Sequence, residues 1–438
     1  MIRLRQGFGG QVRVMVALAA MVGASPLAAQ TISIVNARIS IGDGSAPIEN
    51  GMVLIRDGRI VSAGGGGTPS GEVVDAQGRW VTPGIVAGLT QLGLVEVGAI
   101  GADNDSGADK SPFSAAIDVA PAINSAASSF AITRARGVTR AFVAPDASTD
   151  IFAGQGALID TSNGPNVVTR PRAFQYVELG EDGTNRSGGS RGATHAWFRN
   201  AMMEARDYAR NPSGYDGGRG TDELLMRADV AALVPVLQGR VPLLVHVNRA
   251  ADILQVLALR TEFPDLKLVL VDAQEGWLVA DRIAAANVPV ISSALSDLPS
   301  AFESLGATQS NIGRMQRAGV KVALGEIGAQ PRNTKQSAGN LVALQKLPGA
   351  AGLSWDDALA AATSGPAEAM GMGAEFGSLR PGRRADVVIW DGDPLEIDTA
   401  PVLMWIDGRR QTLETRQTKL RDRYRTPQEG ALPKAYER

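Results

Sequence analysis

Residues 84–370 alternate between short apolar runs and longer amphipathic stretches, and this rhythm restricts the fold more than any other feature of the sequence. The clearest apolar runs have the length of strands; they are residues 137–145, 239–248, 266–274, 287–295 and 319–328. The stretches between them are helical in pattern and include residues 221–238, 250–260, 276–286, 310–318 and 355–363. Buried strands that alternate with helices are typical of parallel βα units. About seven or eight such units favour an α/β fold of the TIM-type (β/α)8 barrel class over an open sheet.

The two ends of the chain have a different texture. Alternating apolar positions separated by Asn-Gly and Asp-Gly turns predict short antiparallel strands. This pattern occurs in residues 31–64, 73–84, 377–395 and 401–413. We therefore expect a small β-sandwich composed of residues 30–83 and 372–415, beside a barrel of residues 84–371, with residues 416–438 as a C-terminal tail.

The first residues have the pattern of a secretory signal peptide. Arg3, Arg5 and Arg13 precede the apolar residues 14–24, and small residues follow. The apolar segment is shorter than the ~20 residues that a membrane-spanning helix needs. We therefore predict a signal peptide of residues 1–29, cleavage near Ala29, a periplasmic or secreted location, and no membrane span in the mature chain.

Composition excludes several kinds of site. The chain has no cysteine, so disulfides, zinc–thiolate sites and cysteine nucleophiles are ruled out. Its formal net charge is −2, and no basic run with interleaved aromatic residues is present, which argues against a nucleic-acid partner.

Several motifs together resemble those of the amidohydrolase superfamily, in particular its exported, imidazolonepropionase-like members. They are GRIVSAG (58–64), VVDAQGRWVTPG (73–84), LLVHVNRAADI (243–253), TSGPAEAMG (363–371), GSLRPGRRADVV (377–388) and WDGDPL (390–395). The resemblance covers nearly the whole mature chain. It implies a barrel with a β-sandwich made from both chain ends. It also implies metal-dependent hydrolysis of C–N bonds in cyclic amides or related rings.

The same resemblance implies a ligand set at the barrel mouth that this sequence largely lacks. Such proteins hold one or two divalent metals with His-x-His on strand 1, a lysine or glutamate on strand 4, histidines on strands 5 and 6, and an aspartate on strand 8. The strand 1 pair falls on Leu89 and Gln91, and the strand 5 histidine on His246. The strand 6 position falls around Asp272 to Gln274, and the strand 8 position on Ile327, with Glu326 beside it. Strand 4 cannot be located from the sequence.

Two interpretations remain open. In the first, the chain is a catalytically degenerate member that acts as a small-molecule-binding protein or as a partner subunit, in a homo-oligomer or with an active relative. In the second, it is a hydrolase with an altered site, in which His246 is the metal ligand, Glu326 is catalytic, and Gln91, Asp272 and Gln274 line the mouth. In this second reading the site either holds one divalent metal ion, for which an oxygen-rich set would suit Mg²⁺, Mn²⁺ or Ca²⁺, or works without a metal. Mutual contact among Gln91, His246, Asp272 and Glu326 would favour it.

Two further sequence features are the polar loops and the second histidine. The polar, glycine-rich segments 98–128 and 180–192 are expected to be loops above the strands, where barrel sites are built. The second of only two histidines, His195, lies near the start of a helical pattern that Ser190 or Thr194 can cap, and we interpret it as structural.

Overall fold

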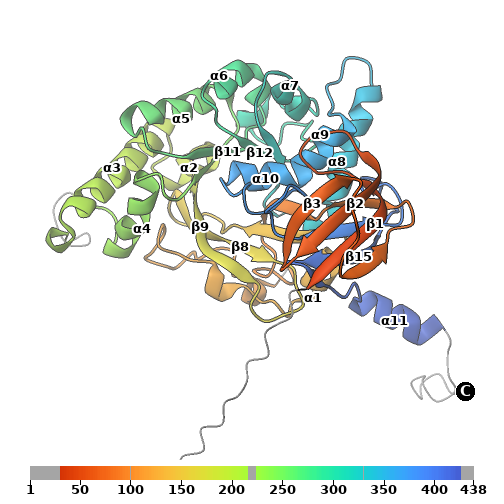
Figure 1. Ribbon diagram of the computed structural model, residues 1–438. Helices are drawn as coiled ribbons and strands as arrows, with labels where there is room; N and C mark the ends of the chain where they lie inside the picture. Colours follow the sequence, from red (N-terminus) through yellow and green to blue (C-terminus); the bar gives the residue numbers. More distant parts are fainter. Residues whose placement is uncertain (1–29, 99, 216–222, 329, 426–438) are drawn as a thin grey trace, which may run out of the picture.

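The computed structural model describes residues 30–98, 100–215, 223–328 and 330–425 (Figure 1). The predicted signal peptide, residues 1–29, and the end of the predicted tail lie outside these ranges. Within the described part of the chain, no helix combines the length and the apolar character that a bilayer span requires.

A sandwich-like sheet unites the two ends of the chain, as predicted. Its strand order is β16-β15-β14-β5-β1-β2-β3, with β4 also paired to β1. The strands are β1 (Thr31–Ile39), β2 (Ile48–Arg56), β3 (Arg59–Gly65), β4 (Glu72–Asp75), β5 (Trp80–Pro83), β14 (Val387–Trp390), β15 (Pro401–Ile406) and β16 (Arg409–Arg410). The N-terminal and C-terminal parts meet where β5 pairs antiparallel with β14. Alternate side chains of β14 divide between two cores, because Val387 and Ile389 pack within the sandwich while Val388 and Trp390 pack toward the barrel.

A second sheet of eight strands forms the barrel, in sequential order from β6 to β13. The strands are β6 (Ile85–Thr90), β7 (Val138–Val143), β8 (Phe152–Asp160), β9 (Val168–Glu178), β10 (Leu243–Val247), β11 (Leu268–Asp272), β12 (Val290–Ser292) and β13 (Val322–Leu324). The ends of the sheet come together without a hydrogen-bonded ladder. Glycine permits this approach, since a Cβ atom at Gly88 would lie 2.4 Å from the Leu324 carbonyl oxygen.

One strand departs from the predicted all-parallel pattern. β8 is antiparallel to both β7 and β9. The connections on either side, residues 144–151 and 161–167, are shorter than the dozen or so residues that a parallel crossover needs. The barrel is therefore TIM-type with one reversed strand.

Helices cover the outer face of the barrel (Figure 1). They are α1 (Ser128–Arg134), α2 (Glu181–Arg186), α3 (Arg191–Arg210), α4 (Arg227–Leu237), α5 (Ala250–Glu262), α6 (Ala280–Ala285), α7 (Asn311–Arg317), α8 (Thr334–Ala343) and α9 (Trp355–Ala362). In contrast, α10 (Ser364–Ala369) packs against the interior cluster of the barrel, and α11 (Arg416–Arg425) extends away from the body. The segment 180–192, expected to be a loop, in fact contains α2. Ser190 caps α3, since its Oγ accepts a hydrogen bond from the Ala193 N–H.

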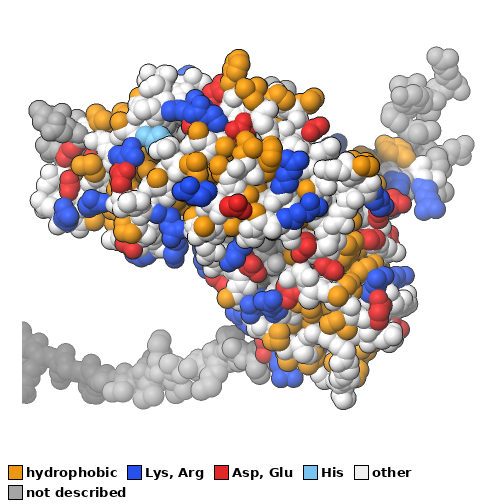
Figure 2. Space-filling model, turned by 90° about the horizontal axis from the view of Figure 1, so that it is seen from above, with side chains coloured by type: hydrophobic (Ala, Val, Ile, Leu, Met, Phe, Trp, Pro, Cys, Tyr) orange, Lys and Arg blue, Asp and Glu red, His pale blue; other side chains and the backbone are white. Residues whose placement is uncertain are grey.

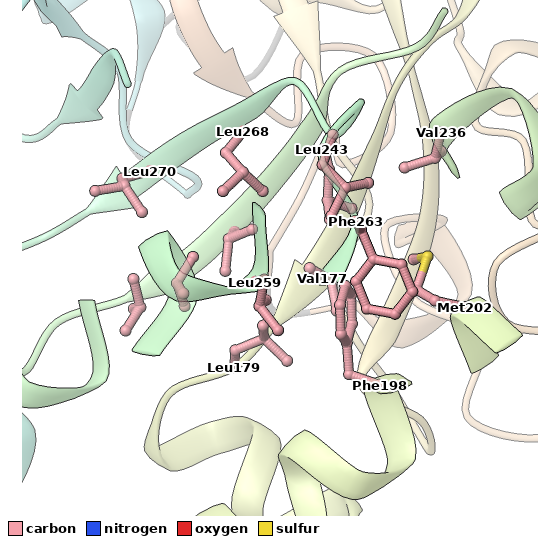
Figure 3. Close-up of a cluster of buried hydrophobic side chains, with 14 of the residues drawn as sticks. Val177, Leu179, Phe198, Met202, Val236, Leu243, Leu259, Phe263, Leu268 and Leu270 are labelled. Atoms are coloured by element: carbon pink, nitrogen blue, oxygen red, sulfur yellow. The ribbon is translucent and has the colours of Figure 1, made fainter. Parts of the chain in front are cut away.

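The largest core lies between the barrel and these helices (Figure 3). Leu243, Leu268 and Leu270 point outward from their strands toward Phe198 of α3 and Leu259 of α5. Because successive strand residues face opposite sides, the residues between them face the barrel interior. That alternation directs the side chain of His246 into the barrel.

Candidate functional site

The candidate site lies at the carboxyl ends of three adjacent parallel strands. Glu178 is the last residue of β9, His246 lies near the end of β10, and Asp272 is the last residue of β11. The register places His246 directly opposite Glu178 on one side and Val271 on the other. The strand order thus brings together two predicted residues, His246 and Asp272, and one that sequence reasoning missed, Glu178.

A carboxylate binds each nitrogen of the His246 ring. Nδ1 of His246 donates to Glu178 Oε2 at 2.5 Å, and Nε2 donates to Asp272 Oδ2 at 3.0 Å. The three side chains are mostly buried, with exposed fractions of 14% for His246, 10% for Glu178 and 22% for Asp272. The imidazole is therefore held in one orientation between two acids.

The backbone at the end of β11 directs Asp272 toward this ring. Val269 and Val271 face the barrel interior, so strict alternation would turn Asp272 outward. Instead Asp272 and Ala273 have positive φ angles of 63° and 45°. This left-handed conformation is uncommon for residues other than glycine and costs of order 1 kcal/mol or more. Ser292 Oγ, which donates to the Asp272 carbonyl oxygen at 2.6 Å, helps to hold it.

The charge on the ring follows from its neighbours. Burial disfavours the charged imidazolium, but the negative charge of Glu178 and the hydrogen bonds to Asp272 and Glu178 outweigh it and raise the pKa of His246 well above its usual value. Tyr176, which lies below on β9, is buried beside Glu178. Its burial and the nearby carboxylates raise its pKa. His246 is therefore a cation near neutral pH, and Tyr176 is a neutral hydrogen-bond donor.

The strand 1 residues do not join this group. Leu89 is only 2% exposed and packs in the barrel interior. Gln91 Nε2 donates to Asp146 Oδ2 at 2.6 Å, and the same carboxylate oxygen accepts from Ser106 Oγ at 2.8 Å. Gln91 thus belongs to a separate polar network at the end of β7.

The remaining predicted residues lie around the mouth in different roles. Glu326 is exposed. Partial desolvation by its surroundings and the negative charge of Asp272 raise the pKa of its carboxyl group. Ile327 packs against the barrel interior and offers no carboxylate. The Gln274 N–H donates to Asn248 Oδ1 at 3.3 Å, while the Gln274 side-chain oxygen is buried without a partner among the described residues.

Sequence reasoning also missed a loop contact. Asn248 Nδ2 lies 3.5 Å from His246 Nε2 and donates to Glu303 Oε1 at 3.0 Å. Glu303 lies far along the chain, and no local pattern marks it. Glu178 could have been predicted, because the resemblance implies a lysine or glutamate on strand 4. The sequence does not show that β8 is reversed, so it did not reveal which strand is the fourth.

The geometry does not suit a metal centred on His246. Glu178 and Asp272 lie at opposite nitrogens of one ring, so they cannot converge with either nitrogen on a single ion. A ligating imidazole also needs a neutral nitrogen with a free lone pair, and both nitrogens here are occupied. Across the described residues, no group of three or more His, Asp or Glu side chains is arranged to hold a metal ion.

Comparisons with known proteins agree with the fold. A family model described as the amidohydrolase family matches residues 240–411. The crystal structure of an amidohydrolase from Thermotoga maritima MSB8 superposes with a TM-score of 0.75 at 23% identity, over 86% of this chain and 99% of that one. An adenosine deaminase from Xanthomonas campestris with bound zinc gives a TM-score of 0.51 at 18% identity, over 90% and 99%.

A curated relative is similar over a short segment. Amidohydrolase tasK of Hapsidospora irregularis is 48% identical over 60 residues, which are 14% of this chain and 6% of the relative's length. Residues 240–411 and this short segment are thus similar to amidohydrolases in sequence, and the solved structures show that the chain shares the fold of such proteins.

Proposed function

We propose that this amidohydrolase-family protein has lost metal-activated hydrolysis and uses its barrel mouth to bind a small organic cation. The observation that carries the proposal is the pair of carboxylates on opposite nitrogens of His246. Metal-activated water chemistry needs a ligand set that leaves one open position, and neither Leu89 nor the carboxylate-bound ring supplies ligands for it.

The excess negative charge at the barrel mouth supports the choice of a cationic ligand. The two carboxylates on His246 exceed the single positive charge of the ring. Glu326 adds a further acid, whose pKa is raised by partial desolvation and by the nearby charge of Asp272. Asp272 and Glu326 are the members of this group that solvent reaches most readily. A primary amine or guanidinium group would bind there by charge-assisted hydrogen bonds.

The first test is the metal content of the mature chain, purified without chelator and measured by elemental mass spectrometry. We expect no stoichiometric divalent metal. About one equivalent that disappears in a His246→Ala variant would instead support the altered-site hydrolase, with His246 as ligand and Glu326 as the catalytic acid or base.

The second test is binding of a panel of primary amines and guanidines, with carboxylates of matched size as controls, followed by thermal unfolding. The amines should raise the melting temperature of the wild type but not of a D272N/E326Q variant. E72Q, which alters an exposed acid in the sandwich, is the matched control. Equal stabilisation of all three proteins would refute the proposed cation site.

A second function, as a partner subunit, is favoured by the loop that follows β12. Glu303 anchors this loop at the mouth through Asn248, yet Leu298 and Phe302 are 83% and 82% exposed. Figure 2 shows hydrophobic side chains exposed among charged ones on the upper face of the molecule. Exposed apolar groups of this size at one place are typical of an interface. We propose a second copy of this chain as the partner.

Light scattering after size exclusion tests this assignment. A dimer that becomes a monomer in an L298S/F302S variant is the expected result, and a wild type that is monomeric at all concentrations would refute the proposed dimer.

We further propose that the protein is exported. Cell fractionation with N-terminal sequencing of the mature chain tests that proposal, and a cytoplasmic protein that retains residues 1–29 would contradict it.

A further inference from the structure

A basic recess lies at the opposite end of the barrel from His246. Its lining residues come from the amino-terminal ends of β9 to β13, from α5 and from the end of α10, and they enclose about 450 Å³. The basic side chains of this recess are Arg170, Arg172, Arg240, Arg260, Lys267 and Lys321. Arg170 and Arg172 lie in the first half of β9, and Arg240, Lys267 and Lys321 shortly precede β10, β11 and β13, so the sheet itself gathers these five at one edge.

The positive charges of the recess are only partly compensated. Arg170 pairs with Glu375, Arg172 pairs with Asp118, and Arg260 donates to a backbone carbonyl. In contrast, Arg240, Lys267 and Lys321 form no ion pair within the described part of the chain. The acid that lines the recess is Glu368. A concave surface with several uncompensated cations concentrates a positive potential, which an anion relieves.

We propose that this recess binds a small polyanion of the phosphate-ester or pyrophosphate class. Arg240, Lys267 and Lys321 would supply the charge-assisted hydrogen bonds, because they have donors to spare. The enclosed volume is within the range of small-molecule pockets. An extended nucleic acid does not fit this description, since the charge is confined to a concave site on a chain whose formal net charge is −2.

The test is isothermal titration of the mature chain with inorganic pyrophosphate at an ionic strength of about 0.05 M, where surface charges are little screened. A K267Q/K321Q variant should bind at least about tenfold more weakly, a loss of roughly 1.4 kcal/mol. The charge-retaining K267R/K321R variant should bind nearly as well as the wild type. Both lysines are exposed, so the substitutions should leave folding intact.

K346Q is the matched control, because Lys346 is an exposed lysine away from the recess. It should bind pyrophosphate like the wild type. Equal weakening by K346Q would mean diffuse attraction to the surface and would overturn the proposal. Failure of the wild type to bind, or unchanged binding by K267Q/K321Q, would overturn it as well.

Discussion

The two ends of the barrel carry opposite charges, and they differ in how these charges are compensated. At the mouth, His246 lies between Glu178 and Asp272, so a buried cation has a partner on each nitrogen. At the other end, Lys267 and Lys321 face a recess with no ion pair among the described residues. Removing one member of a compensated buried group leaves its partners as uncompensated buried charges, whereas uncompensated exposed charges are available to a ligand. This contrast predicts opposite responses to mutation at the two ends.

The largest expected effect is on stability at the mouth. His246→Ala would leave Glu178 and Asp272 close together without a cation between them, which should lower the free energy of unfolding by about 3 kcal/mol. The K267Q/K321Q variant should change it by no more than about 0.5 kcal/mol. Chemical denaturation of both variants measures the difference. A loss below about 1 kcal/mol for His246→Ala would mean that the mouth does not depend on its central cation.

The second prediction concerns the two histidines and pH. His246 has a raised pKa for the reasons given above, whereas burial and the charge of Arg199 lower the pKa of His195. The folded state therefore holds the His246 proton more tightly than the unfolded state, where the histidine pKa is about 6.5. The resulting stabilisation is fully present below pH ~6.5 and is lost as the pH rises through the folded-state pKa. The contribution of His195 to the pH dependence of stability has the opposite sign, because the neutral form of His195 is favoured in the folded state.

Nuclear magnetic resonance can follow both rings separately, because the chain contains only two histidines. We expect the His246 resonances to report an imidazolium at pH 7 and those of His195 a neutral ring. Titration of both rings near pH 6.5 would contradict the proposed carboxylate clamp, in which Glu178 and Asp272 bind the two nitrogens of a charged His246 ring.

Much of the fold was predictable from the sequence, and the exception has a physical reason. The strand runs 239–248 and 266–274 contain β10 and β11, and the helical stretch 250–260 contains most of α5, because apolar periodicity directly reflects burial. The reversed β8 escaped detection, since an apolar run does not reveal its direction. Only the short connections around it carry that information.

The site was less predictable, because its key contacts are set by tertiary structure. The sequence identified His246 and Asp272 but grouped Gln91 with them, whereas Gln91 instead binds Asp146. The left-handed backbone at Asp272, which turns its carboxylate toward the ring, has no glycine to signal it. Pairings between strand ends depend on register and backbone conformation, and neither can be derived from residue types alone.

A smaller effect on stability is expected for removal of the Tyr176 hydroxyl, which lies beneath the carboxylate clamp. Tyr176→Phe removes the neutral hydroxyl beside the Glu178 carboxylate, which should cost about 1 kcal/mol of stability. His246 keeps Glu178 partnered in this variant, so the loss should be smaller than for His246→Ala. Tyr208→Phe serves as a control, because Tyr208 lies on α3, away from the mouth. Equal losses in the two variants would show that Tyr176 acts through packing alone.

The smallest expected effect, and the one that separates the two ends most clearly, is the response to salt. Neutralising Lys267 and Lys321 relieves repulsion among the recess cations, so K267Q/K321Q should be more stable than the wild type by up to about 0.5 kcal/mol at low ionic strength. At ~1 M salt the Debye length is near 3 Å, and this gain should vanish. The loss in His246→Ala should persist at the same salt concentration, because the clamp is mostly shielded from solvent ions. Unfolding curves of both variants at two salt concentrations measure this difference. If salt reduced both effects alike, the mouth charges would be as open to solvent as those of the recess, and the contrast between the two ends would fail.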